Sequence, residues 1–216
     1  MHPAASKAFR RNLGCKRRAC ARSIPVFAEI SPTMKQAEIT RFAILDFEAS
    51  SLSAQSWPIE IGLSWIERDT LQTWHSLIRP APEWNLADWS PQSAAVHGIP
   101  IASLEGAPSA LNVAQEFLKV LRDRRLVSDA PEFEARWLSR LLMVNGEDQV
   151  PLIEDFDGVS FAMYSGYALD IVYETVGRRP APHRAGPDSA RLARGWLLAA
   201  RLQAPGASKA PQSRLS

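Results

Sequence analysis

The chain has 216 residues, of which 46% are hydrophobic and 22% are charged, and its formal net charge is +2. These values are ordinary for a globular protein with one core, and they exclude a fibrous or wholly disordered chain. No run approaches the ~18 consecutive apolar residues that a membrane-spanning helix requires, so no membrane partner is expected.

The charge is distributed unevenly along the chain. Residues 1–41 hold nine Lys and Arg and two acidic residues, which leaves sixteen basic and twenty-one acidic residues in 42–216. The larger part is therefore mildly acidic. This argues against nucleic-acid binding by bulk positive charge, and it is compatible with a cluster of carboxylates that binds cations. Both cysteines, Cys15 and Cys20, lie in the basic part, and we expect a reducing, cytoplasmic location.

We expect the N-terminal residues 1–37 to form a basic, disordered extension. They combine Arg and Lys with Ala, Ser and Pro and show no sustained apolar period. An upstream start codon, a targeting peptide or a nucleic-acid-binding arm would each give such a segment. The folded domain is placed at residues 38–202, and a disordered tail rich in Pro and Ser is expected at 203–216.

The expected domain begins with strands. Short apolar or β-rich runs between turn residues predict three antiparallel strands at 41–47, 58–66 and 71–79. An amphipathic helix at 109–122 follows, behind a Ser109 N-cap. The later elements are a strand at 125–129, a helix at 131–144, a strand at 151–155, and helices at 158–177 and 187–202. This order predicts an α/β fold with a mixed sheet, an antiparallel three-strand meander and helices on both faces.

Two carboxylates, Asp46 and Glu48, stand at the end of the first expected strand. Because side chains alternate along a strand, both point to the same face of the sheet. Two acids beside an apolar run repel each other unless a cation neutralises them, and hard oxygen ligands select Mg²⁺ or Mn²⁺. The alternative is an exposed strand end with two solvated acids.

The residues around this pair carry a family resemblance. Residues 43–62 (AILDFEASSLSAQSWPIEIG) resemble the first motif of the DEDDh 3′–5′ exonuclease superfamily, whose fold is ribonuclease H-like. The resemblance implies that the loop after the Glu holds the terminal nucleotide, which assigns substrate binding to Ala49, Ser50 and Leu52. Leu52 could instead be a core residue that closes the turn.

Two further segments resemble the same superfamily in the right order. Residues 93–99 (SAAVHGI) are similar to its segment ending in His-Gly-Ile, which lies beside the nucleotide and implicates His97; the alternative is a helix end with an exposed His. Residues 182–193 (PHRAGPDSARLA) resemble the third motif, with His183 five residues before Asp188. Pro187 is expected to begin a helix with Asp188 in its first turn, while His183 stays on the preceding loop.

The second motif departs from the superfamily pattern. Residues 126–138 keep its frame, but Glu134 stands where a metal-binding Asp belongs, and Asp129 and Ala130 replace the usual His and Asn. Glu134 keeps the charge and adds a methylene, whereas Mg²⁺ demands near-ideal octahedral geometry. The remaining ligand is therefore Glu134 or Asp129, with Asp129 otherwise a substrate-binding residue.

The resemblance implies a nuclease that releases nucleoside 5′-monophosphates from the 3′ end of single-stranded DNA or RNA, alone or as a homodimer. Two ions, Mg²⁺ or Mn²⁺, would be held by four carboxylates: Asp46, Glu48, Glu134 and Asp188. His183 would take the proton from the attacking water, since imidazole accepts protons near neutral pH. The alternatives are a catalytically weakened nucleic-acid-binding module on the same fold and an unrelated hydrolase of small phosphoesters.

Overall fold

The computed structural model describes residues 38–178 and 180–204. The extension expected at 1–37 and nearly all of the expected tail lie outside these residues. No helix in the described part is both long enough and apolar enough to cross a membrane.

Five strands form one mixed sheet in the order β3-β2-β1-β4-β5. Their bounds are Phe42–Ala49 (β1), Pro58–Glu67 (β2), Thr70–Leu77 (β3), Arg125–Ser128 (β4) and Ile153–Asp155 (β5). β2 pairs antiparallel with β1 and with β3, whereas β4 pairs parallel with β1 and with β5. The expected meander and mixed sheet are confirmed, with strand ends that differ from the expected ones by one or two residues.

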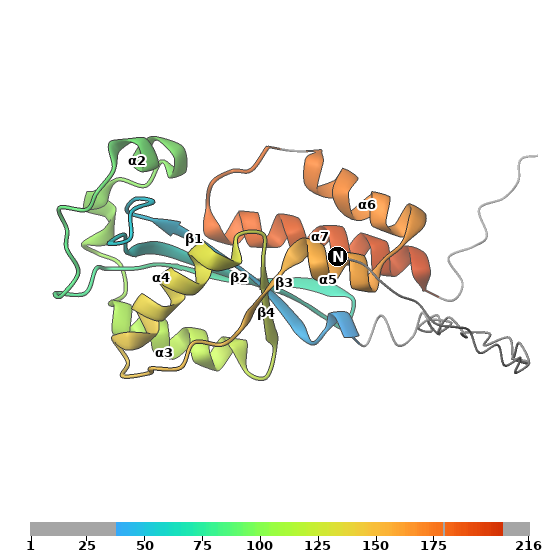
Figure 1. Cartoon of the computed structure of the whole chain (residues 1–216), viewed down its shortest axis with the longest axis horizontal. Helices are drawn as coiled ribbons and strands as arrows, with labels where there is room; N and C mark the ends of the chain where they lie inside the picture. Colours follow the sequence, from blue (N-terminus) through green and yellow to red (C-terminus); the bar gives the residue numbers. More distant parts are fainter. Residues whose placement is uncertain (1–37, 179, 205–216) are drawn as a thin grey trace, which may run out of the picture.

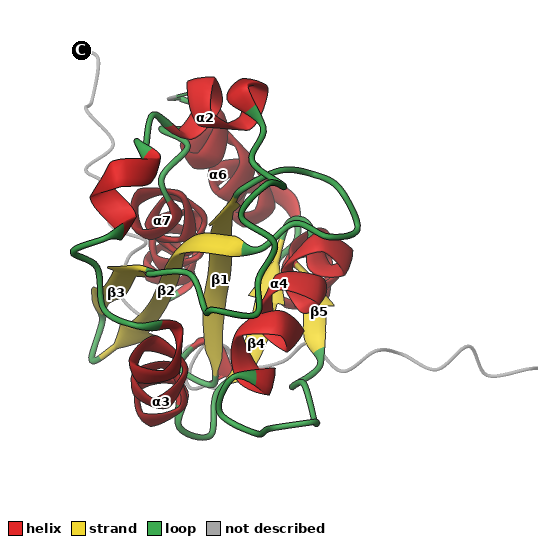
Figure 2. Ribbon diagram, turned by 90° about the vertical axis from the view of Figure 1, so that its left-hand side faces the viewer, coloured by secondary structure: helices red, strands yellow, loops and turns green. Residues whose placement is uncertain are grey.

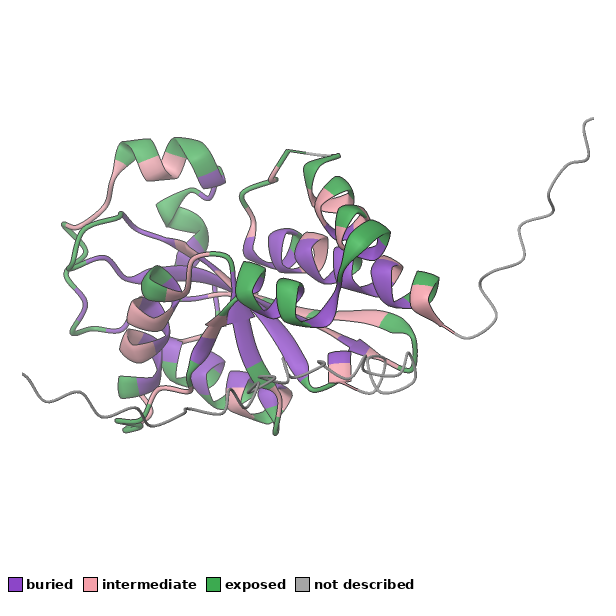
Figure 3. Ribbon diagram, turned by 45° about the vertical axis from the view of Figure 1, so that its right-hand side comes forward, coloured by how far each residue is buried: buried purple, intermediate pink, exposed green. Residues whose placement is uncertain are grey.

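Helices cover both faces of the sheet, as expected (Figures 1 and 2). Their bounds are Pro91–His97 (α2), Ala110–Leu121 (α3), Pro131–Met143 (α4), Phe156–Met163 (α5), Gly166–Gly177 (α6) and Ala185–Gln203 (α7), with a 3₁₀ turn at Ile101–Leu104. α3 and α4 pack on one face, and α5, α6 and α7 pack on the other. Figure 3 shows the buried sheet between these two helical layers.

The C-terminal helices differ from the expected ones. The single helix expected at 158–177 is two helices, because Tyr164 and Ser165 adopt extended backbone angles. The buried Tyr164 hydroxyl donates a hydrogen bond to the carbonyl of Trp196, at 3.1 Å. Gly166, with a left-handed φ of 54°, is the first residue of α6. α7 begins at Ala185 rather than at Pro187, since a first-turn proline lacks only an N–H that has no partner within the helix.

The start of α7 lies directly on the backbone of β2. A Cβ atom added at Gly62 would come within 2.2 Å of the carbonyl carbon and oxygen of Ala185. The neighbouring Ser64 hydroxyl shares a 2.9 Å hydrogen bond with the hydroxyl of Ser189. Only glycine at position 62 allows this approach, which fixes the first turn of α7 against the sheet.

The substitution Gly62→Ala is therefore expected to destabilise the protein by about 1–3 kcal/mol or more, because neither backbone can move aside without displacing α7. Urea unfolding followed by circular dichroism measures the loss. Gly106→Ala is the matched control, since an added Cβ there meets no atom within 4 Å. Equal stabilities for the two variants would refute the close packing.

Candidate functional site

Three carboxylates converge where β1 meets α7. Asp46 and Glu48 on β1 and Asp188 on α7 each offer an oxygen, and these oxygens all lie within 4.8 Å of one another. The two strand residues share the face of Phe42 and Ile44, whose side chains pack in the α7 layer. The sequence prediction that these three acids meet is thus realised in the structure.

The cluster concentrates negative charge in a partly buried place. Burial, followed by repulsion from Glu48 and Asp188, raises the pKa of Asp46 well above its usual value. Burial, with the charges of Asp188 and Glu60 adding to it, raises the pKa of Glu48 to about 7, although the Arg184 guanidinium opposes the shift. Carboxylates held together in this way favour a proton or a cation as partner.

Glu134 is a fourth acid beside this cluster. It lies in the first turn of α4, only 3% of its surface is exposed, and its Oε2 has no hydrogen-bond partner. Burial, followed by the charges of Asp46 and Asp129, raises its pKa well above the usual range. A buried carboxylate oxygen without a partner is costly unless a cation reaches it, so the donor set fits a divalent metal.

Asp129, the other candidate for this ligand, is exposed at the end of β4. Partial desolvation still raises the pKa of its carboxylate. Glu134, in contrast, is almost completely enclosed by protein. The burial and the orphaned oxygen therefore favour Glu134 as the additional ligand.

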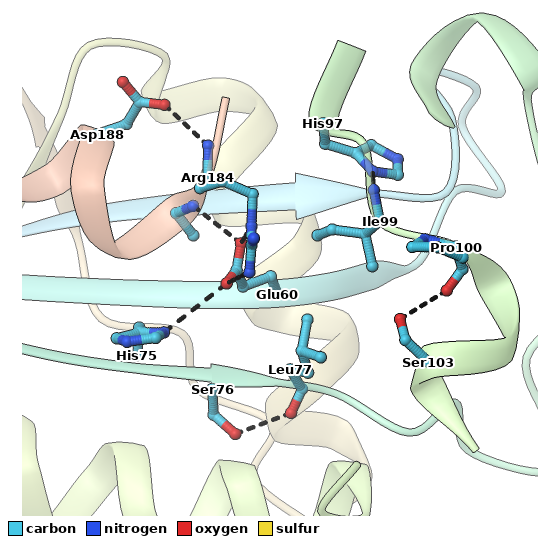
Figure 4. A network of polar contacts seen from close by, with 11 residues as sticks. Glu60, His75, Ser76, Leu77, His97, Ile99, Pro100, Ser103, Arg184 and Asp188 are labelled. Atoms are coloured by element: carbon cyan, nitrogen blue, oxygen red, sulfur yellow. Dashed lines mark hydrogen bonds and ion pairs between the residues drawn. The ribbon is translucent and has the colours of Figure 1, made fainter. Parts of the chain in front are cut away.

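Asp188 is held by its own helix turn. Its Oδ2 accepts the backbone N–H of Arg184 at 3.1 Å, as Figure 4 shows, and its Oδ1 accepts the Nε–H of Arg191 at 3.3 Å. Although α7 begins two residues earlier than expected, Asp188 still lies in its first turn. The helix end and these two donors fix the direction of the carboxylate.

An ion pair between a buried acid and a partly exposed arginine, which the sequence did not reveal, fastens the neighbouring segment. Glu60 on β2 is 1% exposed, and its two oxygens accept Arg184 guanidinium hydrogen bonds of 2.8 and 2.7 Å (Figure 4). The backbone N–H of Ala185 donates to the same carboxylate at 3.1 Å. The only signal in the sequence was an acid inside an apolar strand; its partner lies 124 residues away.

His183 immediately precedes this anchor. It is exposed, its φ of 52° lies in the left-handed region, and within the described ranges no hydrogen bond or ion pair engages its ring. The structure therefore places His183 on the loop beside Asp188 but does not join it to the acids. A non-glycine residue in the left-handed region is strained, so the turn needs a contact that holds it. The ion pair between Arg184 and Glu60 supplies that contact.

A hollow of about 230 Å³ borders Glu48 on the side of α2 and α4. Ala49, Leu52, Val96 and His97 are among its lining residues. Leu52 is 68% exposed, so the alternative that it is a core residue is wrong. The expected Ser50 does not line the hollow.

Ser50 has a structural task instead. Its buried hydroxyl accepts the backbone N–H of Trp57 at 3.0 Å, and its carbonyl accepts the N–H of Ser90. These bonds tie the loop after β1 both to β2 and to the start of α2. Ser50 thus shapes the loop that carries Ala49 and Leu52.

His97 forms part of the floor of this hollow and is 5% exposed. Its Nδ1 accepts the backbone N–H of Ile99 at 3.0 Å, so in the neutral ring Nε2 carries the hydrogen. That Nε2 is buried without a partner, and burial lowers the pKa of the ring. Gly98 does cap α2 with a left-handed φ of 64°, but the alternative of an exposed His is wrong.

The acid cluster predicts a pH-dependent stability in the absence of metal. The pKa of Glu48 rises from 4.5 to about 7 on folding, so its contribution is present at low pH and is lost as the pH rises through 7. The variant Glu48→Gln should therefore gain thermal stability relative to the native chain as the pH increases. Melting curves in EDTA between about pH 5 and pH 8 measure this difference.

Addition of Mg²⁺ or Mn²⁺ should reverse the trend, because metal binding stabilises the native state and requires the deprotonated acids. The metal-induced rise in Tm is thus expected to grow with pH in the native chain and to be smaller in Glu48→Gln. A metal effect that is equal in both proteins would contradict a site at this cluster.

Comparisons with known proteins agree with this geometry. A family model described as Exonuclease, RNase_T, matches residues 43–194, a range that includes all three converging acids. A search of curated proteins finds no relative that matches the chain.

Solved structures of exonucleases have a similar fold. A 3′-exonuclease in a structure of 3′-end recognition of the histone mRNA stem-loop is 16% identical over 74% of this chain and 80% of that one, with a TM-score of 0.52. The nuclease domain of 3′hExo, a DEDDh family member bound to rAMP, is 17% identical over 74% and 90%, with a TM-score of 0.51. E. coli Exonuclease I in complex with a dA16 oligonucleotide is 13% identical over 73% and 40%, with a TM-score of 0.53.

At these identities the structural likeness establishes the fold alone, and it confirms the expected ribonuclease H-like α/β architecture. The family model carries the assignment further, since it spans most of the chain. The chain therefore belongs to the RNase_T exonuclease family.

Proposed function

We propose that the protein is a metal-dependent 3′–5′ exonuclease that releases nucleoside 5′-monophosphates from single-stranded DNA or RNA. The observation that carries the proposal is the convergence of Asp46, Glu48 and Asp188 within 4.8 Å, beside the buried Glu134, whose Oε2 has no hydrogen-bond partner. Family membership and the adjoining hollow support it.

The proposed ligands are Asp46, Glu48, Glu134 and Asp188, and Asp46, which neighbours both Glu48 and Glu134, would help to hold both ions. An all-oxygen donor set favours Mg²⁺ or Mn²⁺. When bound, such ions supply Lewis-acid activation of the attacking water and stabilise the leaving 3′ oxygen. Glu134 interacts electrostatically with Asp46 from α4, and its longer side chain is proposed to take the place of the Asp of the superfamily pattern.

His183 is proposed to accept the proton of the attacking water. Its loop is tethered at Arg184 and at Asp188, which leaves the exposed ring as the group that can turn toward the cluster. In proteins without substrate such catalytic contacts are often unformed, so the lack of a bond to the acids is compatible with this role.

The hollow beside Glu48 is proposed to hold the terminal nucleoside. Leu52 and Val96, 68% and 55% exposed, offer apolar surfaces that suit the face of a base. Ala49 and the loop after β1 border the sugar, while the Nε2–H of His97 is a donor for a sugar or base oxygen. Asp129, at the end of β4, stays an alternative substrate contact.

The direct test is digestion of a single strand of roughly 20 nucleotides, labelled at its 5′ end, with Mn²⁺, with Mg²⁺ and with EDTA. The expected result is a metal-dependent ladder of shortened strands and release of nucleoside 5′-monophosphates, while the Asp188→Asn variant gives no ladder. Matched DNA and RNA strands decide the substrate class. Internal cleavage, or release of products from the 5′ end first, would overturn the proposal.

A catalytically weakened binding module is the second candidate, favoured by Glu134 in place of the usual Asp. It predicts metal-dependent retention of the strand with no shortening. A hydrolase of small phosphoesters predicts cleavage of a nucleotide ester but no ladder.

A further inference from the structure

A second and larger hollow lies at the end of α6 and along α7. Its volume is about 500 Å³, and Arg178, Arg191 and Arg194 line it together with prolines of the linking segment. No acidic residue is among its described lining residues. We name it the arginine groove, after these three side chains.

One residue of the groove contacts the proposed active site. Arg191, on its wall, donates a hydrogen bond to the Asp188 carboxylate at 3.3 Å. Pro182, also on its wall, immediately precedes His183. Figure 1 shows the segment from the end of α6 returning to the start of α7, on the side of the molecule where α2 lies. The acid cluster therefore has the hollow at α2 beside Glu48 and a residue of the arginine groove bonded to Asp188.

Two of the arginines can engage a new partner. Arg194 is exposed and makes no hydrogen bond or ion pair with any described residue. Arg178 pairs with Glu174 at 3.3 Å, but both side chains are more than half exposed, and such surface pairs contribute little. Arg191 differs, because it is held by Asp188 and by the carbonyl of Val176.

We propose that the arginine groove binds the phosphodiester backbone of the substrate strand on the 5′ side of the scissile bond. Guanidinium groups bind phosphate oxygens in a bidentate manner, and the rest of the folded chain is mildly acidic, so this is a local anion site. The strand would run from the hollow at α2, across the acids, into the groove. The inference rests on the proposed function and adds to it a contact outside the catalytic centre.

The experiment compares Arg194→Ala, Arg178→Ala and the double variant with Lys119→Ala. Lys119 lies on α3, on the opposite face of the sheet, and is 73% exposed, so the control removes one surface charge elsewhere. Binding of a labelled single strand of roughly 20 nucleotides is measured by fluorescence anisotropy in Ca²⁺ over a range of salt concentrations. Hydrolysis is measured with the same strand and with the 4-nitrophenyl ester of thymidine 5′-phosphate, which has no phosphate that reaches the groove.

The double variant is expected to bind the strand roughly tenfold more weakly, with a salt dependence shallower by ~0.7 for each phosphate that the groove no longer neutralises. Its KM for the strand rises to match, while hydrolysis of the small ester keeps its rate. The proposed role of the arginine groove would be overturned if the double variant bound the strand as tightly as Lys119→Ala does. It would also be overturned if the double variant lost as much activity on the small ester as on the strand. If the native chain binds the strand without cleaving it, the proposed exonuclease activity is refuted, while the binding comparison still tests the arginine groove. If the native chain neither binds nor cleaves the strand, both proposals are refuted.

Discussion

Replacing Asp46 with asparagine is expected to abolish turnover and, at the same time, to stabilise the metal-free protein. The half-buried carboxylate lies among other acids, and both desolvation and repulsion raise its pKa. Asparagine keeps the shape and removes the charge, so the metal-free cluster loses one of its mutually repelling charges. Without the shared ligand, turnover should fall by at least about 10³-fold, which corresponds to roughly 4 kcal/mol of transition-state stabilisation.

The two effects are measured separately, by strand digestion with Mn²⁺ and by melting curves in EDTA. Asp148→Asn is the matched control, because Asp148 is an exposed acid in the loop before β5 and its replacement should change neither result. A structural role for Asp46 predicts the opposite sign in EDTA, that is, a lower Tm in the asparagine variant. A lower Tm in EDTA, or retained turnover, would contradict the assignment of Asp46 as a metal ligand.

The parts of the site that the sequence predicted are those set by local periodicity. The alternation of β1 places Asp46 and Glu48 on one face, and the spacing of His183 and Asp188 places the acid in a helix turn and the His before it. Sequence order alone could not show that these two segments meet. The family resemblance supplied that step, and the oxygens within 4.8 Å agree with it.

The features that the sequence did not predict depend on contacts between distant residues. Glu60 and Arg184 are 124 residues apart, and although Glu60 is an acid inside an apolar strand, no local pattern points to Arg184 as its partner. The break at Tyr164 follows from a hydroxyl that bonds to α7, which overrides the helical periodicity of 158–177. The arginine groove likewise exists only because α6 packs against α7. The choice between Glu134 and Asp129 as the additional ligand also depended on their burial, which residue type alone does not reveal.

His183→Ala carries the second large expected effect, a fall in turnover of about 10²–10⁴-fold with metal binding unchanged. The ring is exposed and bonded to no described residue, so its removal disturbs neither the acids nor the fold. The metal-induced rise in Tm should therefore equal that of the native chain. This combination separates a proton acceptor from a metal ligand, whose removal would lower both.

Added imidazole distinguishes the chemical role of His183 from a positional one. A cavity left at an exposed position is open to the small base, which should restore part of the turnover of His183→Ala and none of that of Asp46→Asn. Loosening the loop instead, by Glu60→Gln, frees Arg184 and should lower turnover without any response to imidazole, because the ring is present but misplaced. If imidazole restores neither the turnover of His183→Ala nor the pH dependence of that turnover, another group is the base. The strained turn at His183 would then have the structural role of directing Arg184 toward Glu60.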